Sequence, residues 1–180
     1  MATDYALHAV RTNNADISIY GETKFATAMA SKDFHQQMGK GARLVYANAP
    51  PCLSKQGKII THQYGVAVVI HNPLYKITPI ASSRLGMVAL TVIAPDAEKF
   101  LLIAIYLPPL KGKKSKKVRR KILQLAAAVW ARERRHHHGG GVIGGDINAQ
   151  PGKTDDRIPH PKATVTSKVI QGSIFYTIKT

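Results

Sequence analysis

Cysteine, acidic side chains and long apolar runs are all scarce in this chain. Its one cysteine, Cys52, excludes an internal disulfide and a site built from several thiolates. We therefore expect a reducing, intracellular compartment, the nucleus being compatible with this. No apolar run approaches the roughly 20 residues that a membrane-spanning helix needs. The first residues lack a basic segment followed by an apolar one, so neither a membrane span nor a secretory signal is expected.

The shortage of acidic residues leaves the chain strongly basic. Lys and Arg number 26 and Asp and Glu number 10, which gives a net charge of +16. A field of this sign attracts polyanions and speeds their encounter with the protein. Nucleic acid, DNA in particular, is the partner we favour. An acidic membrane face, an acidic protein or solubility alone are the other interpretations of the charge, and no obligate protein partner is evident.

The length and the apolar pattern predict one α/β domain covering residues 1–180, since domains usually have roughly 100–200 residues. Strands are predicted at 16–20, 42–47, 65–71, 85–93, 100–106 and 142–147, with one or two more within 165–178. Residues 95–97 favour a hairpin turn, residues 5–12 a short helix, and residues 25–39 a mixture of helix and loop. Strands interspersed with helices indicate a layered fold with a mixed sheet.

A second helix is predicted at 118–135, a segment rich in good helix formers. Its apolar stripe consists of Val118, Ile122, Leu125 and Val129, with Ala126 and Trp130 beside it. The three histidines 136–138 are interpreted as helix-end residues that the helix dipole favours. The basic stretch 111–121, with Lys113, Lys114, Lys116 and Lys117, is either a solvated helix start or a contact to a phosphate backbone.

Acidic residues lie at the ends of two of the predicted strands. Glu22 comes after the strand 16–20, and Asp146 lies within the apolar segment 142–147. Strand ends at one rim of a sheet are where α/β enzymes place their sites. Mg²⁺ prefers hard oxygen ligands, takes few of them from the protein and keeps several waters. Asn148 points to the same face as Asp146 in an extended backbone, so its amide is placed to hold a phosphate oxygen or a water.

Four segments, in this order, carry a resemblance to a known family. Residues 16–24 resemble a "D-I-x-x-x-x-E-T-K" element, and residues 65–70 resemble a "G-V-A-I-L-V" strand. Residues 100–108 resemble a strand that ends in "Y-x-P", and residues 142–149 resemble "I-x-G-G-D-F-N-A". Together they resemble the endonuclease/exonuclease/phosphatase (DNase-I-like) family over residues 7–149. The wording "G-E-T-K", "Y-x-P" and "G-G-D-x-N-A" is most similar to the nucleases of LINE-type retrotransposons.

The resemblance implies a fold, a metal and a set of site residues. The fold would be a partial four-layered α/β sandwich, with mixed, mainly antiparallel sheets flanked by helices. Glu22 would bind Mg²⁺ or Mn²⁺, and Tyr106, Asp146 and Asn148 would be the catalytic residues of a phosphodiester hydrolase acting on nucleic acid. Tyr106 would face the scissile phosphate.

Parts of the family pattern are not found in the sequence. The family's first strand carries an Asn, and its C-terminal part carries an Asp and an "S-D-H" element with the catalytic His. Only His160 follows Asn148, and its surroundings do not match that element. Gly21 and Ile147 are minor departures within the matched segments. We therefore expect a partial copy of the domain that is weak or inactive by itself.

Two other functions and several non-functional interpretations stay open. The chain could be a phosphoinositide-type phosphatase of the same fold, or a basic nucleic-acid-binding remnant without catalysis. Glu22 could be an ordinary exposed carboxylate, Asp146 and Asn148 could simply form a turn, and Tyr106 could serve strand packing. DNA nicking or phosphoinositide turnover separates the enzymatic alternatives.

Overall fold

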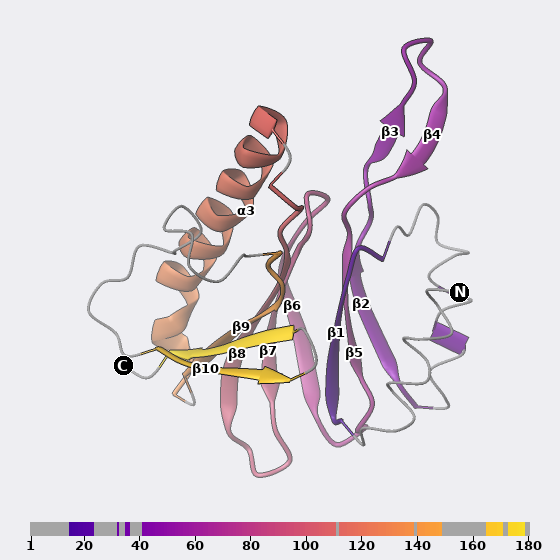
Figure 1. Cartoon of the computed structure of the whole chain (residues 1–180). Coiled ribbons are helices and arrows are strands. Elements are labelled where there is room, and N and C mark those ends of the chain that lie inside the picture. Colours follow the sequence, from indigo (N-terminus) through magenta and orange to yellow (C-terminus); the bar gives the residue numbers. More distant parts are fainter. Residues whose placement is uncertain are drawn as a thin grey trace.

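A computed structural model describes residues 15–23, 32, 35–36, 41–110, 112–138, 140–148, 165–170 and 173–178. The described elements form two sheets packed face to face, with one long helix on the outer face of the larger sheet (Figure 1). The predicted helix 5–12 and nearly all of the mixed segment 25–39 lie outside the described residues. The described part thus holds three of the layers that a four-layered sandwich would have, and it confirms the predicted α/β class.

The smaller sheet has three antiparallel strands. They are β1 (Ile17–Gly21), β2 (Arg43–Ala47) and β5 (Val66–Ile70), in the order β1-β5-β2. Every residue of the central strand β5 is fully buried. This is the burial that its unbroken run of apolar, mostly β-branched residues predicts.

The larger sheet has six strands in the order β10-β11-β9-β8-β7-β6. They are β6 (Lys76–Ser83), β7 (Met87–Ile93), β8 (Lys99–Tyr106), β9 (Gly141–Asp146), β10 (Val165–Ile170) and β11 (Ser173–Ile178). All pairs are antiparallel except β8 and β9, which run parallel. Parallel neighbours need a crossover connection, and the long helix supplies it. The pairing sets Tyr106 beside Asp146 at one rim of the sheet.

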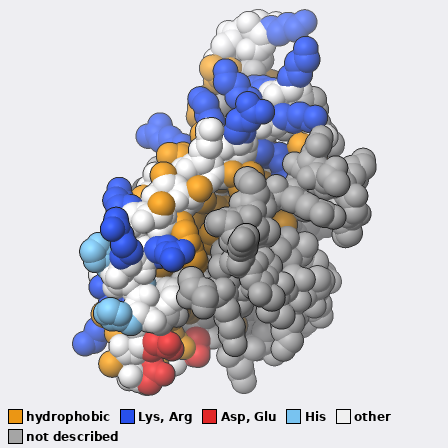
Figure 2. All heavy atoms as spheres, turned by 90° about the vertical axis from the view of Figure 1, so that its left-hand side faces the viewer, with side chains coloured by type: hydrophobic (Ala, Val, Ile, Leu, Met, Phe, Trp, Pro, Cys, Tyr) orange, Lys and Arg blue, Asp and Glu red, His pale blue; other side chains and the backbone are white. Residues whose placement is uncertain are grey.

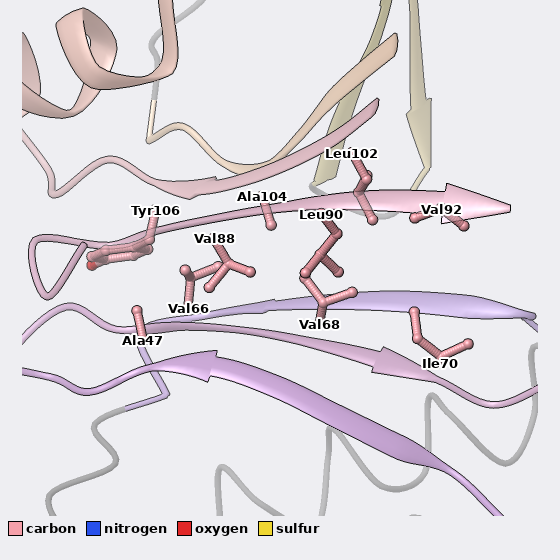
Figure 3. Packing of buried hydrophobic residues seen from close by; sticks show 10 residues of the cluster. All are labelled: Ala47, Val66, Val68, Ile70, Val88, Leu90, Val92, Leu102, Ala104 and Tyr106. Atoms are coloured by element: carbon pink, nitrogen blue, oxygen red, sulfur yellow. The ribbon is translucent and has the colours of Figure 1, made fainter. Parts of the chain in front are cut away.

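Two apolar layers hold these elements together. Between the sheets lies a cluster that extends from Ile70 to Tyr106 (Figure 3). Tyr106 lies at one end of this cluster, near Ala47, Val66 and Val88. On the other face of the larger sheet, residues such as Leu101, Ile103 and Ile105 pack against the helix. Strand β8 therefore has a core on both faces, which fixes the position of its last residue, Tyr106.

The helix α3 (Gly112–Glu133) differs from the prediction in two ways. It begins six residues earlier than predicted, because Lys is itself a good helix former, so the four lysines lie in its first turns. Leu125 is 41% exposed, whereas Ser115 and Arg119 are buried. The buried face is centred on Ile122 and Ala126, which leaves Leu125 outside its margin.

A short 3-10 helix, η1 (Arg134–His136), follows α3. Of the three adjacent histidines, His137 is buried, whereas His136 and His138 are exposed. The His137 ring contacts the Glu133 carbonyl through Nδ1 at 2.7 Å and the Thr91 hydroxyl through Nε2 at 2.9 Å. The predicted helix-end residue thus also joins α3 to β7.

Three strands were missed in the sequence. One is β6, an edge strand that contains Pro79 and a bulge between Pro79 and Ala81. Proline is tolerated in such positions but obscures the strand pattern. The others are β3 (Pro51–Leu53) and β4 (Ile59–His62), which form a separate two-stranded hairpin. In the described part of the chain, no helix is both long and apolar enough to cross a membrane.

Candidate active site

Three strands end together at one rim of the two sheets. Strand β1 ends at Gly21, and β8 and β9 end side by side at Tyr106 and Asp146. A Cβ atom added to Gly21 would lie 2.9 Å from Cδ2 of Tyr106 and 3.0 Å from Cβ of Asp146. The glycine therefore lets the smaller sheet approach the larger one closely. Its neighbour Glu22 is brought to the same rim, so the departure that looks minor in the sequence has a steric role.

The pKa of the Tyr106 phenol depends on the charged groups around it. Burial, followed by the negative charges of Glu22 and Asp146, raises the pKa of Tyr106 to about 12, and Tyr64 adds to this rise. A hydrogen bond with the Asn148 side chain acts in the opposite direction and lowers the pKa. Because both carboxylates act on one phenol, the structure brings together Glu22, Tyr106, Asp146 and Asn148. These four are the residues that the sequence predicts for the site.

Hydrogen bonds tie the ends of β8 and β9 to each other. The Leu107 amide donates to the Asp146 carbonyl at 2.8 Å. The Asn148 amide donates to Oδ1 of Asp146 at 3.0 Å, and its Nδ2 donates to the Leu107 carbonyl, also at 3.0 Å. One of the two side-chain amide hydrogens of Asn148 is thus used to hold the loop. The other donates to the Tyr106 phenol oxygen, which is why Asn148 lowers the pKa of that phenol.

The backbone around Tyr106 is conformationally costly. Glu22, Tyr64 and Asn148 have φ values of 51°, 70° and 42°, in the left-handed region. Each such non-glycine residue costs about 1–2 kcal/mol. Strain of this kind persists only where the surroundings impose it, and it gathers at functional sites. Three of the four described non-glycine residues with positive φ thus lie at the rim of the phenol and the two carboxylates, and the fourth, Ala97, lies in the turn between β7 and β8.

Tyr64 and Arg119 belong to the site but were not identified in the sequence. The Tyr64 and Tyr106 rings lie 6.3 Å apart between centroids, tilted by 39°. The buried Arg119 donates from Nη1 to the carbonyls of Pro108 at 2.9 Å and Ile147 at 3.0 Å. It thereby joins the loops that follow β8 and β9. An arginine on the predicted apolar side of a helix was the available signal, because a buried guanidinium needs acceptors.

The donor set suits a small divalent cation. Glu22 and Asp146 offer carboxylate oxygens, which are the hard ligands that Mg²⁺ and Mn²⁺ prefer. In the described residues, no group of three or more His, Cys, Asp or Glu is arranged to hold a metal ion. Mg²⁺ commonly uses only one or two carboxylates with several waters. The residues at the rim therefore fit such an ion.

Charge is distributed unequally between the two rims of the sheets. Among the described acidic residues, Glu22 and Asp146 lie at the site rim. Asp16, Asp96, Glu98 and Glu133 lie at or near the opposite ends of the strands and helix. The exposed Lys113, Lys114, Lys116 and Lys117 lie in the first turns of α3, which holds the site loops through Arg119. Figure 2 shows Lys and Arg side chains spread over the α3 face and acidic side chains gathered at its lower end.

Two of the described histidines lie away from this rim. His71 follows β5 at the opposite end of the smaller sheet, where its Nε2 contacts the Ser18 hydroxyl at 3.0 Å. His137 follows η1 and contacts Thr91 in β7. Neither is placed to serve as an acid or base beside Tyr106.

Comparison with known proteins gives a result only at the level of structure. No protein-family model matches the chain, and no curated protein matches it in sequence. A humanized D. rerio TDP2 is similar over 97% of this chain and 72% of its own length, with a TM-score of 0.62 and 9% identity. An endonuclease/exonuclease/phosphatase family protein from Bacteroides thetaiotaomicron matches over 85% of this chain and 55% of its own, with a TM-score of 0.59 and 13% identity.

The 3' phosphatase NExo from Neisseria, bound to product DNA hairpin, is also similar. It covers 83% of this chain and 53% of its own length, with a TM-score of 0.54 and 17% identity. The chain thus spans little more than half the length of two of these three structures. At such identities the likeness concerns the fold. The mixed sheets and the flanking helix are those of the DNase-I-like fold that these structures share.

Proposed function

We propose that this chain is a phosphodiester hydrolase of nucleic acid that depends on Mg²⁺ or Mn²⁺. The observation that supports this best is the convergence of two carboxylates, Glu22 and Asp146, on the buried phenol of Tyr106. Glu22 is the proposed metal ligand, with Asp146 close enough to share in holding the ion. The bound ion would offset negative charge on the phosphate and on the leaving oxygen.

The protein's own groups have separate roles in this proposal. The raised pKa keeps the Tyr106 phenol protonated at neutral pH, so it can donate a hydrogen bond to a phosphate oxygen. Asp146 accepts from the attacking water and orients it. Asn148 donates to the phenol oxygen of Tyr106 and thereby leaves the phenol hydrogen for the phosphate. Arg119 holds the two loops that carry these groups.

The choice of nucleic acid as substrate rests on charge. Four exposed lysines lie in the first turns of α3, and the first turn of this helix contains no acidic residue. The positive end of the helix dipole adds to their field. The lysines repel one another, and bound phosphate groups reduce this repulsion. DNA binding is therefore proposed to be electrostatic and without sequence preference, with an affinity that falls as salt rises. An intracellular, nuclear location belongs to the same proposal.

Activity is proposed to be slow. General acid–base help is worth about 10²–10⁴ in rate, and His71 and His137 are engaged with Ser18 and Thr91, away from the site rim. Similarity to LINE-type retrotransposon endonucleases is part of the proposal and rests on the "G-E-T-K", "Y-x-P" and "G-G-D-x-N-A" segments. A reverse transcriptase encoded beside this chain would support that origin.

Nicking of supercoiled plasmid DNA tests the proposed function. The chain should give slow nicking that requires Mg²⁺ or Mn²⁺ and that disappears in Glu22→Ala and in Asp146→Ala. Asp96→Ala, a carboxylate at the opposite rim, is the matched control and should nick at the parental rate. Nicking that persists in Glu22→Ala would contradict the proposed metal site. Fast nicking by the parent would contradict the proposal that activity is slow.

A second candidate is nucleic-acid binding without hydrolysis. The basic first turns of α3 favour it, because their charge does not depend on the carboxylates. In that case the chain would bind DNA with a steep salt dependence, and the metal would have no effect on the DNA. The Mg²⁺ requirement in the nicking assay separates the two candidates.

A further inference from the structure

The hairpin of β3 and β4 extends from the site rim as a separate arm. Its strands pair only with each other among the described strands, and it projects past the ends of β1 and β5 (Figure 1). Ser54 organises its turn: its amide donates to the Lys58 carbonyl at 2.7 Å. Its hydroxyl accepts from the amides of Gln56 at 3.2 Å and Lys58 at 3.1 Å. The arm therefore has a defined turn.

The base of the arm is part of the site wall. Strand β4 leads into Tyr64, whose ring lies 6.3 Å from that of Tyr106. The Gln63 amide donates to the Pro50 carbonyl at 3.1 Å and closes the base. The seven or eight residues from Tyr64 to the turn, at ~3.3 Å each, give an arm of roughly 20–25 Å. Anything bound at the site that extends in this direction passes along the arm.

The middle of the arm carries exposed apolar side chains. Leu53, Ile59 and Ile60 are 54%, 61% and 67% exposed. Leu53 and Ile59 are cross-strand partners, and the register shifts between this pair and the next one, Cys52 with Thr61, so that Ile60 lies at a bulge. A bulge increases the local twist of the ribbon. Three large apolar side chains are therefore open to a partner on a twisted ribbon beside the site.

The composition of the arm indicates the chemistry of the partner that it binds. Its tip is polar and basic, with exposed Lys55 and Lys58, and residues 51–62 contain no Asp or Glu. A hairpin that inserts into a lipid bilayer would need an apolar tip. Residues 51–61 also lack the aromatic rings on which single-stranded bases stack. The major groove of a duplex offers thymine methyl groups among its base edges and phosphates along its rims, so it has partners for both kinds of side chain on the arm.

We propose that this hairpin is a groove-binding arm that lies in the major groove of duplex DNA beside the cleavage site. This rests on the proposed function, because it takes the substrate of that site to be nucleic acid. The major groove admits a two-stranded β-ribbon. Leu53, Ile59 and Ile60 contact base edges and thymine methyl groups, and Lys55 and Lys58 neutralise phosphates. Apolar side chains read no hydrogen-bond pattern, so sequence preference stays weak.

The length of the arm gives the proposal a measurable footprint. With one phosphate per 3.4 Å of a strand, an arm of roughly 20 Å extends along about six base pairs. Duplex DNA that extends at least this far on one side of the cleaved bond reaches the whole arm and binds more tightly. A small phosphodiester does not reach the arm at all.

Binding of the full chain to a labelled duplex of about 20 base pairs tests the arm. One variant combines Leu53→Thr, Ile59→Thr and Ile60→Thr, because threonine is polar and has the β-branched shape that strands favour. Leu74→Thr is its matched control, as Leu74 is 67% exposed but lies beyond the opposite end of β5. A second variant, Lys55→Ala with Lys58→Ala, is matched by Arg134→Ala with Arg135→Ala at the far end of α3.

The triple variant should weaken duplex binding about tenfold, because less apolar surface is buried against the DNA. The lysine variant should reduce the slope of log affinity against log salt by about 0.9 for each phosphate that is no longer neutralised. Neither should change binding to single-stranded DNA by as much. Duplex binding at parental strength in both variants would contradict the proposed role of the arm in binding DNA. If the arm variants lost binding to phosphatidylserine vesicles and retained duplex binding, the arm would be assigned to a membrane instead.

Hydrolysis of bis(p-nitrophenyl) phosphate separates this proposal from the proposed function. The parent and both arm variants should cleave this small diester equally, whereas Glu22→Ala should not cleave it. If the parent fails to cleave it while the arm variants lose duplex binding, the arm stands and the hydrolase proposal fails. If cleavage is normal and duplex binding is unchanged in the variants, the hydrolase stands and the arm fails.

Discussion

The two ends of strand β1 carry two carboxylates with opposite surroundings. At one end, the exposed Asp16 accepts a hydrogen bond at each carboxylate oxygen: Oδ1 accepts from Asn72 Nδ2 at 2.9 Å and Oδ2 from the Tyr75 hydroxyl at 3.2 Å. Its carbonyl accepts from the His71 amide at 2.8 Å. At the other end, Glu22 is exposed, has a left-handed backbone and acts on the Tyr106 phenol.

The contrast separates a carboxylate that holds the fold from one that is placed for chemistry. The hydrogen bonds of Asp16 join β1 to the turn after β5, and they lower the energy of the folded state. The position of Glu22 costs conformational energy and adds a negative charge beside another carboxylate. Residues of the second kind are those at which stability and function are expected to be separable.

The largest expected effect is on hydrolysis. It is seen when Glu22 and Asp16 are each replaced by alanine in separate variants. Glu22→Ala should reduce Mg²⁺-dependent nicking by about 10³-fold, equivalent to roughly 4 kcal/mol, and leave the urea midpoint nearly unchanged. Asp16→Ala should lower the free energy of unfolding by about 1–3 kcal/mol and keep the nicking rate. Initial nicking rates and urea titrations measure the two effects. A similar loss of activity in both variants would remove the distinction between the two ends of β1.

The next largest effect concerns the two glycines at the ends of β9. A Cβ atom at Gly145 would lie 1.9 Å from the Ile105 carbonyl oxygen, and its φ is +136°. Gly145→Ala should therefore cost about 3 kcal/mol or more of stability and shift Asp146. Gly140, with φ +80°, has nothing within 4 Å of the added atom, so Gly140→Ala should cost only about 1–2 kcal/mol. Equal unfolding free energies in the two variants would argue against the close β8–β9 contact at the site.

A smaller effect is expected on DNA affinity. Replacing Lys113, Lys114, Lys116 and Lys117 by alanine should weaken duplex binding about tenfold or more and flatten its salt dependence. Arg134→Ala with Arg135→Ala removes charge from the other end of α3 and should change affinity less. Fluorescence anisotropy over a series of salt concentrations measures both. Binding that is independent of salt in the parent would contradict an electrostatic interface.

The smallest effect is on the pKa of Tyr106. Burial is the main cause of its rise to about 12 and the two carboxylates are the next causes. Glu22→Gln and Asp146→Asn should therefore each lower this pKa, though not to the ordinary value of a tyrosine. Asp96→Asn at the opposite rim should leave it unchanged. Absorbance titration of the phenols, with Tyr106→Phe to assign the step, measures these changes.

The same raised pKa has a consequence for stability. The folded protein favours the protonated Tyr106 phenol more than the unfolded chain does. The contribution of this phenol to the free energy of unfolding is therefore fully present below pH 10, the pKa of an ordinary tyrosine. It should be lost as the pH rises from 10 towards 12. In Tyr106→Phe, this part of the alkaline destabilisation should be absent.

Much of the fold could be predicted from local pattern. The β-branched run at 66–70 gives a buried strand, and the residues around 95–97 give a hairpin, because both depend on neighbouring residues alone. One or two strands were predicted within 165–178, and the structure has two there, β10 and β11. The start of α3, the edge strand β6 and the arm were not, since lysines, a bulged proline and a serine-organised turn leave weak periodicity.

The order of apolar segments and the strand-end acids are properties of the sequence alone. The sequence by itself determined that residues near 22, 106, 146 and 148 would end strands. It also determined that the chain would carry a net charge of +16. Tertiary structure decided that these ends meet, because Gly21 allows the sheets to approach and the parallel register sets Tyr106 against Asp146. It also decided that Arg119 is buried and that Tyr64 joins the site. Burial patterns follow from the periodicity of one segment, whereas distances between segments depend on packing among all of them.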